Sequence, residues 1–234
     1  MKVLAIDTTG LAASVAIVDY KKTIAEFTVN FKKTHSQTIM PMLDYMFNII
    51  GIEPKEVDYI ACANGPGSFT GLRIGAASAK GMAHALSKKI IPVPTLDALA
   101  YNIFKTDKII VPMIDARNNQ VYTSFYRHNN DKFEKITDYF AEDITKVLEM
   151  LKNTFSEKAV FLGDGAKVYF DKIKDFYGED GLASPNLNMQ RAASVGALAI
   201  KMGEKYAVNY DEFSIIYLRK PQAEREYDER EKLK

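Results

Sequence analysis

The sequence of 234 residues contains one cysteine and three histidines. The single cysteine, Cys62, excludes a disulfide framework and is typical of a reducing compartment, and its place in the apolar run VDYIACA predicts a small buried residue. The histidines His35, His84 and His128 form no pair four residues apart and no H-E-x-x-H motif, so no metal site is predicted. No serine lies in the G-x-S-x-G context of a nucleophile elbow. Metalloenzymes and serine hydrolases are therefore disfavoured.

The sequence also lacks an excess of charge of either sign, since 31 Lys and Arg residues face 30 Asp and Glu residues. No overall positive field can hold a nucleic acid backbone, so RNA or DNA would need a partner or a local patch. The N-terminal stretch MKVLAID has too few apolar residues for a signal peptide or a membrane span. Hydrophobic residues make up 47% of the chain, which is ample for a core. We expect a globular cytoplasmic protein without a membrane segment.

Hydrophobic periodicity in the first part of the chain predicts a mixed α/β unit. Short apolar runs separated by polar turns indicate strands, and apolar residues at helical spacing indicate helices. The run at residues 57–63 is almost continuously apolar, which is typical of a strand covered on both faces. We expect strands at residues 2–6, 13–18, 23–29, 57–63 and 90–93, and helices at residues 35–50, 70–87 and 95–104.

The second part of the chain repeats this order, because residues 109–115 echo residues 3–7 and both runs end at an aspartate. We expect strands at residues 121–126, 133–136 and 159–162, and helices at residues 142–151 and 191–202. The last residues form a polar tail that cannot fold alone. The repeat predicts an α/β fold of two halves, residues 1–104 and 105–234, each a mixed sheet with packed helices.

The stretch NGPGSFTGLRIG, residues 64–75, joins a predicted strand to a predicted helix. It fails the P-loop pattern, which needs Lys and then Ser or Thr after the last glycine, and it misses the dinucleotide fingerprint by one residue. The start of the helix can still favour an anion, with Ser68, Thr70 and Arg73 close by. The alternative is a tight strand-to-helix connection that binds no ligand.

Polar residues at the ends of the first strand of each half are further candidates for ligand binding. Asp7, which precedes Thr8, and Asp115 could hold Mg²⁺ or orient a water molecule, although acidic residues at strand ends also form turns. The candidate contacts to an anion or nucleotide are therefore Asp7, Thr8, Ser68, Thr70 and Arg73.

The helix that follows the loop carries small residues at four-residue spacing. They leave a surface on which another backbone can approach closely, and such packing would offset the ~1 kcal/mol that each glycine inside a helix costs. The helix at residues 35–50 is apolar around more than one face, and this wide surface is buried either within the chain or against a partner. We place the contact at Ile39, Met42, Met46, Gly71, Gly75, Ala79 and Ala83.

Six blocks of the sequence, in order, resemble the bacterial TsaB family, also called YeaZ: VLAIDTT, SVAI, THSQTIMPML, ANGPGSFTGLRIG, AASAKGMA and IDARNNQVY. A later YLR at residues 217–219 also fits, and the resemblance weakens between about residues 130 and 210. It implies the duplicated, ribonuclease H-like α/β fold that actin, Hsp70 chaperones and sugar kinases share, often called the ASKHA fold. This agrees with the two-half repeat.

The resemblance also implies a function. Family members act in making threonylcarbamoyladenosine next to the anticodon of tRNA, as partners of the subunit TsaD, which transfers the threonylcarbamoyl group from threonylcarbamoyl-AMP. The chain is then a non-catalytic subunit whose helices at residues 35–50 and 71–87 contact TsaD, or a second copy of itself when TsaD is absent. It lacks the histidine metal pair of TsaD, because Ile39 stands four residues after His35. The complex, joined by the ATPase TsaE, would use ATP and Mg²⁺ and contact tRNA, and the isolated chain would bind no cofactor.

Two other functions remain open on the residues alone. Asp7, Thr8 and the glycine-rich loop would suit a stand-alone ATP-dependent phosphotransferase of the actin and sugar kinase type, although DTTG departs from the fuller phosphate motif of active relatives. A glycoprotease-type peptidase is a label attached to the broader family, but the chain has neither metal ligands nor a nucleophile for it.

Overall fold

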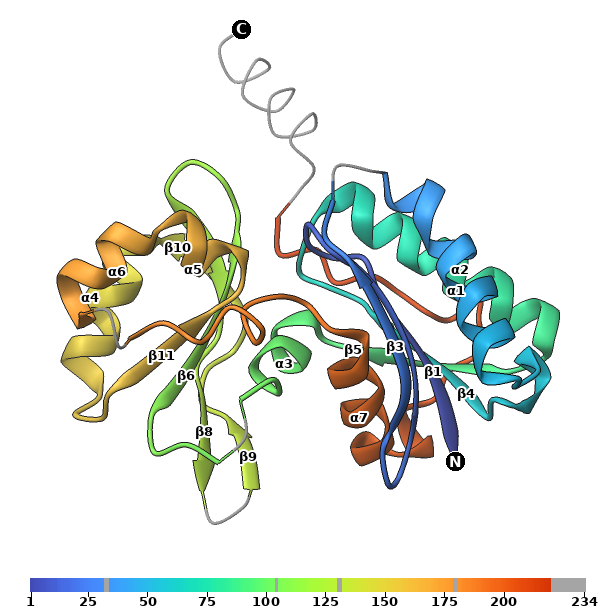
Figure 1. Ribbon diagram of the computed structural model, residues 1–234. Helices are drawn as coiled ribbons and strands as arrows, with labels where there is room; N and C mark the ends of the chain where they lie inside the picture. Colours follow the sequence, from blue (N-terminus) through green and yellow to red (C-terminus); the bar gives the residue numbers. More distant parts are fainter. Residues whose placement is uncertain (32–33, 104, 130–131, 179–180, 220–234) are drawn as a thin grey trace, which may run out of the picture.

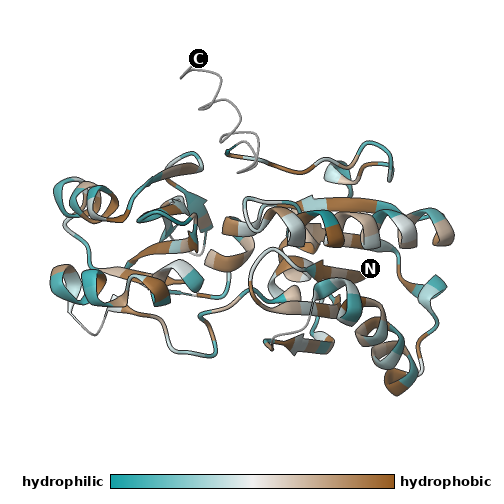
Figure 2. Ribbon diagram, turned by 90° about the horizontal axis from the view of Figure 1, so that it is seen from above, coloured by the Kyte–Doolittle hydropathy of each residue, from teal (hydrophilic) through white to brown (hydrophobic). Residues whose placement is uncertain are grey.

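The computed structural model describes residues 1–31, 34–103, 105–129, 132–178 and 181–219. These residues form two α/β lobes that lie side by side (Figure 1). We call the lobe around β1 (Lys2–Asp7) the first lobe and the lobe around β6 (Ile109–Asp115) the second lobe. From above, the helices carry both hydrophobic and hydrophilic stretches (Figure 2). No helix within the described residues is long and apolar enough to cross a membrane.

The first lobe is built on a five-stranded sheet with the strand order β3-β2-β1-β4-β5. Its other strands, all close to the predicted positions, are β2 (Ala13–Asp19), β3 (Thr23–Val29), β4 (Tyr59–Ala63) and β5 (Lys89–Val93). The first three strands form an antiparallel meander because short polar turns connect them. β4 and β5 run parallel to β1, because a helix precedes each of them.

Two long helices, α1 (His35–Ile50) and α2 (Phe69–Leu86), pack on one face of this sheet. α1 ends where Gly51 adopts a left-handed conformation and its N–H donates to the carbonyl oxygen of Phe47. Ser68 caps the start of α2, since its Oγ accepts a hydrogen bond from the N–H of Gly71 at 3.3 Å. A shorter helix, α3 (Thr95–Ala100), leads to the second lobe.

The second lobe is built on a six-stranded sheet around β6. Its other strands are β7 (Gln120–Thr123), β8 (Tyr126–Asn129), β9 (Lys132–Lys135), β10 (Phe140–Asp143) and β11 (Ala159–Leu162). The single strand predicted at residues 121–126 is thus divided into β7 and β8. Both pair with β6 in one antiparallel register, and the break between them falls opposite Pro112. A proline has no N–H for the ladder, which explains the interruption.

Helices α4 (Ile144–Thr154), α5 (Asp164–Val168) and α6 (Phe170–Tyr177) pack on one face of the second sheet, and α3 packs on its other face. Asp143 caps α4 by accepting a hydrogen bond from the N–H of Thr145 at 2.8 Å. The apolar side of α4 meets the aromatic core of the lobe, where the ring of Phe125 lies edge-on to those of Phe140 and Phe155.

Helix α7 (Ala192–Met202) belongs by sequence to the second half but packs on the first sheet, on the face opposite α1 and α2. It lies against β1 and β2, and Gly196 lets it come so close that a Cβ there would meet Val18 and Ala5. Figure 1 shows α7 beside β3 and below β5, on the side of the first sheet that faces away from α1 and α2. The strands of this sheet are apolar on both faces, so one pair of helices cannot bury them, and the last helix covers the second face. The sequence predicted a boundary between the two halves at residues 104–105. In the structure α7, which follows this boundary, packs in the first lobe.

The segment after α7, residues 207–219, returns across the first lobe, and we call it the C-terminal strap. Val208 pairs with Ile90 of β5, and the buried ring of Phe213 joins the core under α1 and α2. Further on, the N–H of Ile216 donates to the carbonyl oxygen of Asn64 at 2.7 Å. The strap thus reaches the start of the glycine-rich loop. The tail beyond residue 219 lies outside the described residues.

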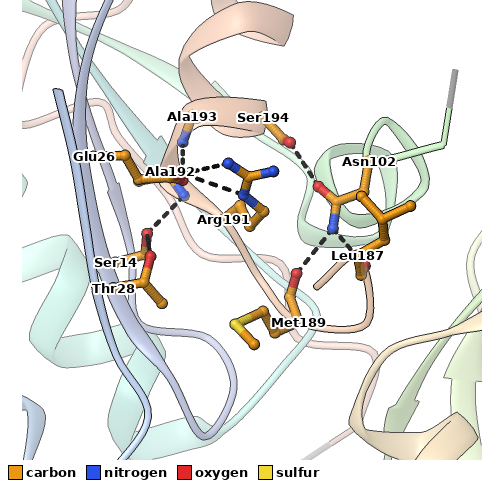
Figure 3. A network of polar contacts seen from close by, with 10 residues as sticks. All are labelled: Ser14, Glu26, Thr28, Asn102, Leu187, Met189, Arg191, Ala192, Ala193 and Ser194. Atoms are coloured by element: carbon orange, nitrogen blue, oxygen red, sulfur yellow. Dashed lines mark hydrogen bonds and ion pairs between the residues drawn. The ribbon is translucent and has the colours of Figure 1, made fainter. Parts of the chain in front are cut away.

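A polar network fixes the N-terminus of α7 to the first sheet (Figure 3). The carboxylate of Glu26 on β3 accepts hydrogen bonds from the guanidinium of Arg191 and, at 3.0 Å, from the N–H of Ala193. Ser14 accepts a hydrogen bond from the N–H of Ala192 at 2.9 Å. These side chains satisfy N–H groups that a helix leaves unpaired at its start. The network therefore fixes α7 on the second face of the first sheet.

Removal of the Glu26 carboxylate should therefore destabilise the protein. We expect Glu26→Ala to lower the free energy of unfolding by about 2 kcal/mol, because Arg191 and the N-terminus of α7 lose their acceptor. Denaturant titration followed by circular dichroism measures the change. Lys146→Ala is the matched control, since it breaks only an exposed ion pair with Glu142 and should cost about 0.5 kcal/mol or less. Equal effects of the two substitutions would contradict the assigned role of the network.

Candidate functional site: an interlobe cleft and an exposed helical face

A cleft of about 630 Å³ lies between the two lobes. The first lobe contributes the turn after β1, the glycine-rich loop and the start of α2, and the second lobe contributes the end of β6 and parts of α5. Residues 216–219 of the C-terminal strap also line it. The cleft is therefore formed by segments that are far apart in the sequence and that the fold brings together.

The glycines of α2 accommodate the turn that follows β1. A Cβ at Gly71 would overlap the carbonyl oxygen of Thr8, and a Cβ at Gly75 would overlap its Oγ1. Thr8 Oγ1 itself donates a hydrogen bond to the carbonyl oxygen of Gly71 at 2.8 Å. The small residues at the start of α2 thus let the helix pack directly on the β1 turn.

The glycines of the loop accommodate backbone in the same way. A Cβ at Gly67 would lie 2.6 Å from the carbonyl oxygen of Thr9. Gly65, at a φ of 115°, faces the carbonyl oxygen of Ile216 in the C-terminal strap, and a Cβ there would overlap it. What approaches these glycines is backbone of the same lobe. The loop is a tight strand-to-helix connection.

Of the five candidate anion contacts, the structure places two in the cleft, namely Ser68 and Thr70. Asp7 is buried, and its Oδ1 accepts hydrogen bonds from the N–H and the hydroxyl of Thr9 at 2.9 and 2.7 Å. Thr8 is buried against α2 as described. Arg73 lies on the outer side of α2, where its guanidinium stacks on the ring of Phe69 at 3.9 Å. The turn after β1 is therefore filled by side chains of the protein itself.

The buried Asp7 should make stability depend on pH in a distinctive way. Burial raises the pKa of Asp7 from 3.8 to about 6, and the hydrogen bonds from Thr9 and the charge of His35 only partly oppose this. The folded state then keeps the proton between pH 4 and pH 6 whereas the unfolded chain releases it, so the contribution of Asp7 falls as the pH rises through this window.

We expect Asp7→Asn to remove that dependence, because the amide oxygen can still accept from Thr9 and no charge is buried. The difference in unfolding free energy between wild type and Asp7→Asn should change by roughly 3 kcal/mol between pH 4 and pH 7, with wild type relatively weaker at pH 7. Urea titrations at several pH values measure it. A difference that does not vary with pH would contradict a buried, protonated Asp7.

The second lobe lines the cleft with two acidic side chains, Asp115 and Asp164, and with Arg117. Asp164 Oδ1 accepts a hydrogen bond from the N–H of Asp115 at 3.1 Å, and burial raises the pKa of Asp164. The hydroxyl of Tyr169 donates to Asp115 at 3.0 Å. Sequence analysis singled out Asp115 but missed Asp164, whose only signal was its position between two glycines. Within the described residues, no group of three or more His, Cys, Asp or Glu side chains could hold a metal ion.

The residues that we placed at a partner contact are buried in the chain itself. Ile39, Met42 and Met46 pack in the core between α1 and the sheet, and Ala79 and Ala83 of α2 lie in the same cluster. Gly71 and Gly75 meet Thr8. None of these side chains forms the outer surface of the two helices, so a partner that docks on α1 and α2 must meet other residues.

The exposed side of α1 and α2 nevertheless carries apolar and small residues among polar ones such as Asp44 and Arg73. On α1, Met40 is 50% exposed, Tyr45 is 56% exposed and Ile49 is 58% exposed. On α2, Ala77 and Gly81 are exposed, and a Cβ at Gly81 would have open space within 4 Å. We call these residues the outer helical face. Exposed apolar residues that gather on adjacent helices are typical of an interaction site.

His35, the one histidine at the start of α1, has a structural role. Its Nε2 lies 3.0 Å from the carbonyl oxygen of Gly10, beside the cleft, and the next residue on the same side, Ile39, is buried in the core. A second metal ligand is therefore missing at the position where helical spacing would place it.

The two α/β lobes, each a mixed sheet with packed helices, and the cleft between them define the ribonuclease H-like class of actin, sugar kinases and their relatives. A family model described as "TsaD: tRNA N6-adenosine threonylcarbamoyltransferase" matches residues 23–223. The TsaB protein of Bacillus subtilis (strain 168) is 33% identical over 232 residues, which cover 99% of this chain and 100% of that protein. The TsaB protein of Haemophilus influenzae is 31% identical and covers 94% of both chains. The chain belongs to the bacterial TsaB family, also called YeaZ.

Solved structures show the same fold. YeaZ from Pseudomonas aeruginosa has a TM-score of 0.72 at 21% sequence identity, covering 93% of this chain and 99% of that one. A second solved structure, described as an uncharacterized protein with similarity to peptidase YEAZ from Pseudomonas aeruginosa, has a TM-score of 0.76 at 24% identity with the same coverage. The predicted family and the duplicated α/β fold are confirmed, and the stand-alone phosphotransferase is not favoured.

Proposed function

We propose that the chain acts in the biosynthesis of threonylcarbamoyladenosine in tRNA, as a non-catalytic cytoplasmic subunit that binds and supports TsaD. The observation that carries this proposal is the match over the full length of relatives named as tRNA threonylcarbamoyladenosine biosynthesis proteins TsaB. The family model that carries the description of TsaD supports a partner of related fold. TsaE and tRNA would join through the complex.

The outer helical face is the surface that we propose for TsaD. Its apolar side chains on α1 and its small residues on α2 allow two helices of a partner to pack closely, which is how helices bury apolar area. The same face would pair two copies of the chain when TsaD is absent. Both arrangements require only the exposed residues and leave the core under α1 and α2 unchanged.

The chain itself would not bind ATP and Mg²⁺, and we assign their use to the complex. The support for this is the β1 turn, where Asp7 and Thr8 are buried and hydrogen-bonded. Calorimetry with Mg-ATP tests it. Binding of Mg-ATP to the isolated chain at submillimolar concentration would contradict this assignment and would support the phosphotransferase function.

Size-exclusion chromatography of the purified chain mixed with its cognate TsaD tests the proposed function directly. We expect one peak of higher mass than either protein, with or without added nucleotide. Rescue of a bacterium that lacks its own TsaB, measured as threonylcarbamoyladenosine in total tRNA, is the second readout. Two independent peaks in all conditions, together with no rescue, would contradict the proposal.

A further inference from the structure

We infer that Arg73 binds a carboxylate of the partner protein and so fixes how that partner lies on the outer helical face. We predicted Arg73 at an anion site beside the glycine-rich loop, but its side chain lies on the outer side of α2. TsaD is taken as the partner, so this assignment rests on the proposed function. Arg73 would then determine the register in which the two proteins pack.

Two aromatic side chains hold the guanidinium of Arg73 in place. Its Cζ lies 3.9 Å from the ring centroid of Phe69, one turn earlier on α2, and its Nε–H donates to the hydroxyl of Tyr217 at 3.4 Å. The two rings also touch, with centroids 5.4 Å apart. Tyr217 belongs to the C-terminal strap, so the fold brings it to Arg73 across 144 positions of the sequence. We call these three residues the arginine anchor.

Arg73 has no carboxylate partner among the residues that the structure describes. α2 contains no Asp or Glu, and Asp44, the one acid of α1, forms no ion pair with Arg73. Tyr217 engages Nε and the ring of Phe69 covers one face, so the edge with Nη1 and Nη2 is left for a ligand. Two parallel N–H groups match the two oxygens of a carboxylate. Because Arg73 is exposed, a partner can reach this edge.

The arginine anchor is continuous with the outer helical face. Residues four apart on an α-helix lie on one side of it, so Arg73 is in line with Ala77 and Gly81, and all three are exposed. A partner helix that packs closely on Ala77 and Gly81 would bring an acidic side chain within reach of Arg73. A guanidinium that is already held in place loses little freedom on binding, so its ion pair stabilises the complex more than that of a mobile lysine would.

A protein carboxylate fits this surface better than a phosphate of RNA does. RNA binding needs several cations along one surface, and α1 contains no Lys or Arg. The other such cation of α2, Lys80, is half-buried, with its Nζ 6.0 Å from the ring centroid of Phe213. The outer helical face instead carries exposed apolar side chains such as Tyr45 and Ile49. An arginine beside aromatic and apolar residues is typical of a protein–protein interface.

Surface plasmon resonance with immobilised cognate TsaD tests the inference on the full chain. We expect Arg73→Gln to weaken binding about 30-fold and Arg73→Lys about tenfold, because lysine keeps the charge but cannot donate two parallel hydrogen bonds. Tyr217→Phe should weaken binding about threefold in wild type and have no further effect in Arg73→Gln, because Tyr217 acts only through Arg73. The matched control is Lys152→Gln, which removes an exposed cation from α4 and should bind as wild type does.

An exchange of charges identifies the group that Arg73 binds. Arg73→Glu should weaken binding to wild-type TsaD about 100-fold, because two carboxylates then face each other. TsaD variants that each replace one surface Asp or Glu by Arg are measured against this variant. We expect one of them to bind Arg73→Glu about tenfold more tightly than wild-type TsaD does. Every variant of the chain should keep the circular dichroism signal of wild type, since Arg73 is exposed.

Unchanged affinity of Arg73→Gln for TsaD, an equal loss in Lys152→Gln, or no rescue by any TsaD variant would overturn the inference and leave the proposed function intact. If Arg73→Gln keeps its affinity for TsaD while the complex loses affinity for tRNA, Arg73 binds a phosphate and the inference is wrong. If wild type does not bind TsaD at all, the proposed function fails as well. The failures of the two proposals are therefore distinguishable.

Discussion

Gly71→Ala is expected to lower the free energy of unfolding by about 3 kcal/mol, although it adds one methyl group. The added Cβ would overlap the carbonyl oxygen of Thr8, which belongs to the backbone of the turn after β1 and cannot rotate away. Relief would need α2 to move off that turn, which would also lengthen the hydrogen bond from Thr8 Oγ1 to the carbonyl oxygen of Gly71. Urea denaturation followed by circular dichroism measures the loss.

Gly81→Ala is the control in the same helix. A Cβ at Gly81 meets nothing within 4 Å, so the substitution should raise the unfolding free energy by up to about 1 kcal/mol through helix propensity alone. If both substitutions stabilise the protein, the conclusion that α2 packs closely on the β1 turn is contradicted. If both destabilise it equally, the conclusion that Gly71 is tightly packed and Gly81 has open space around it is wrong.

Gly81→Trp is expected to weaken association with TsaD at least 100-fold, which corresponds to about 2.7 kcal/mol. The exposed position of Gly81 lets the isolated chain fold with the new side chain, but an indole ring there would hold a partner helix away from α2 and from Tyr45 and Ile49 of α1. Surface plasmon resonance with immobilised TsaD measures the affinity.

Glu149→Trp, on the exposed side of α4 in the second lobe, is the matched control for a large aromatic side chain on a helix. It should bind TsaD as wild type does. Both variants should keep the helical circular dichroism signal of wild type, so that a loss of binding cannot be attributed to unfolding. Unchanged affinity in Gly81→Trp would move the proposed interface away from the outer helical face.

Local pattern predicted much of this fold. α1 was expected at residues 35–50 and β11 at residues 159–162, and both have these bounds in the structure. Their periodicity is strong because each element has a continuous apolar side. The break between β7 and β8 was missed, since it depends on Pro112 of a neighbouring strand, and the return of α7 to the first sheet was missed because it is a contact across the whole chain.

The candidate site was predicted less well than the fold. Sequence analysis found α1, α2 and the glycine-rich loop, but it placed the partner contact on Ile39, Met42 and Met46, which are core residues. An apolar residue on a helix that is apolar around more than one face gives no sign of which face turns inward. The residues left outside, such as Tyr45 and Ile49, could be identified only after the sheet had defined the inner side.

The sequence by itself determined the family, the class of fold, the order of the elements and the absence of the histidine pair, because each of these depends on residue types and spacings along the chain. Only the tertiary structure decided what the glycines of residues 64–75 accommodate. The carbonyl oxygens of Thr8 and Thr9 and that of Ile216 come from distant segments. A glycine in the sequence indicates that another atom packs close to its backbone. Only the fold of the chain determines which atom that is.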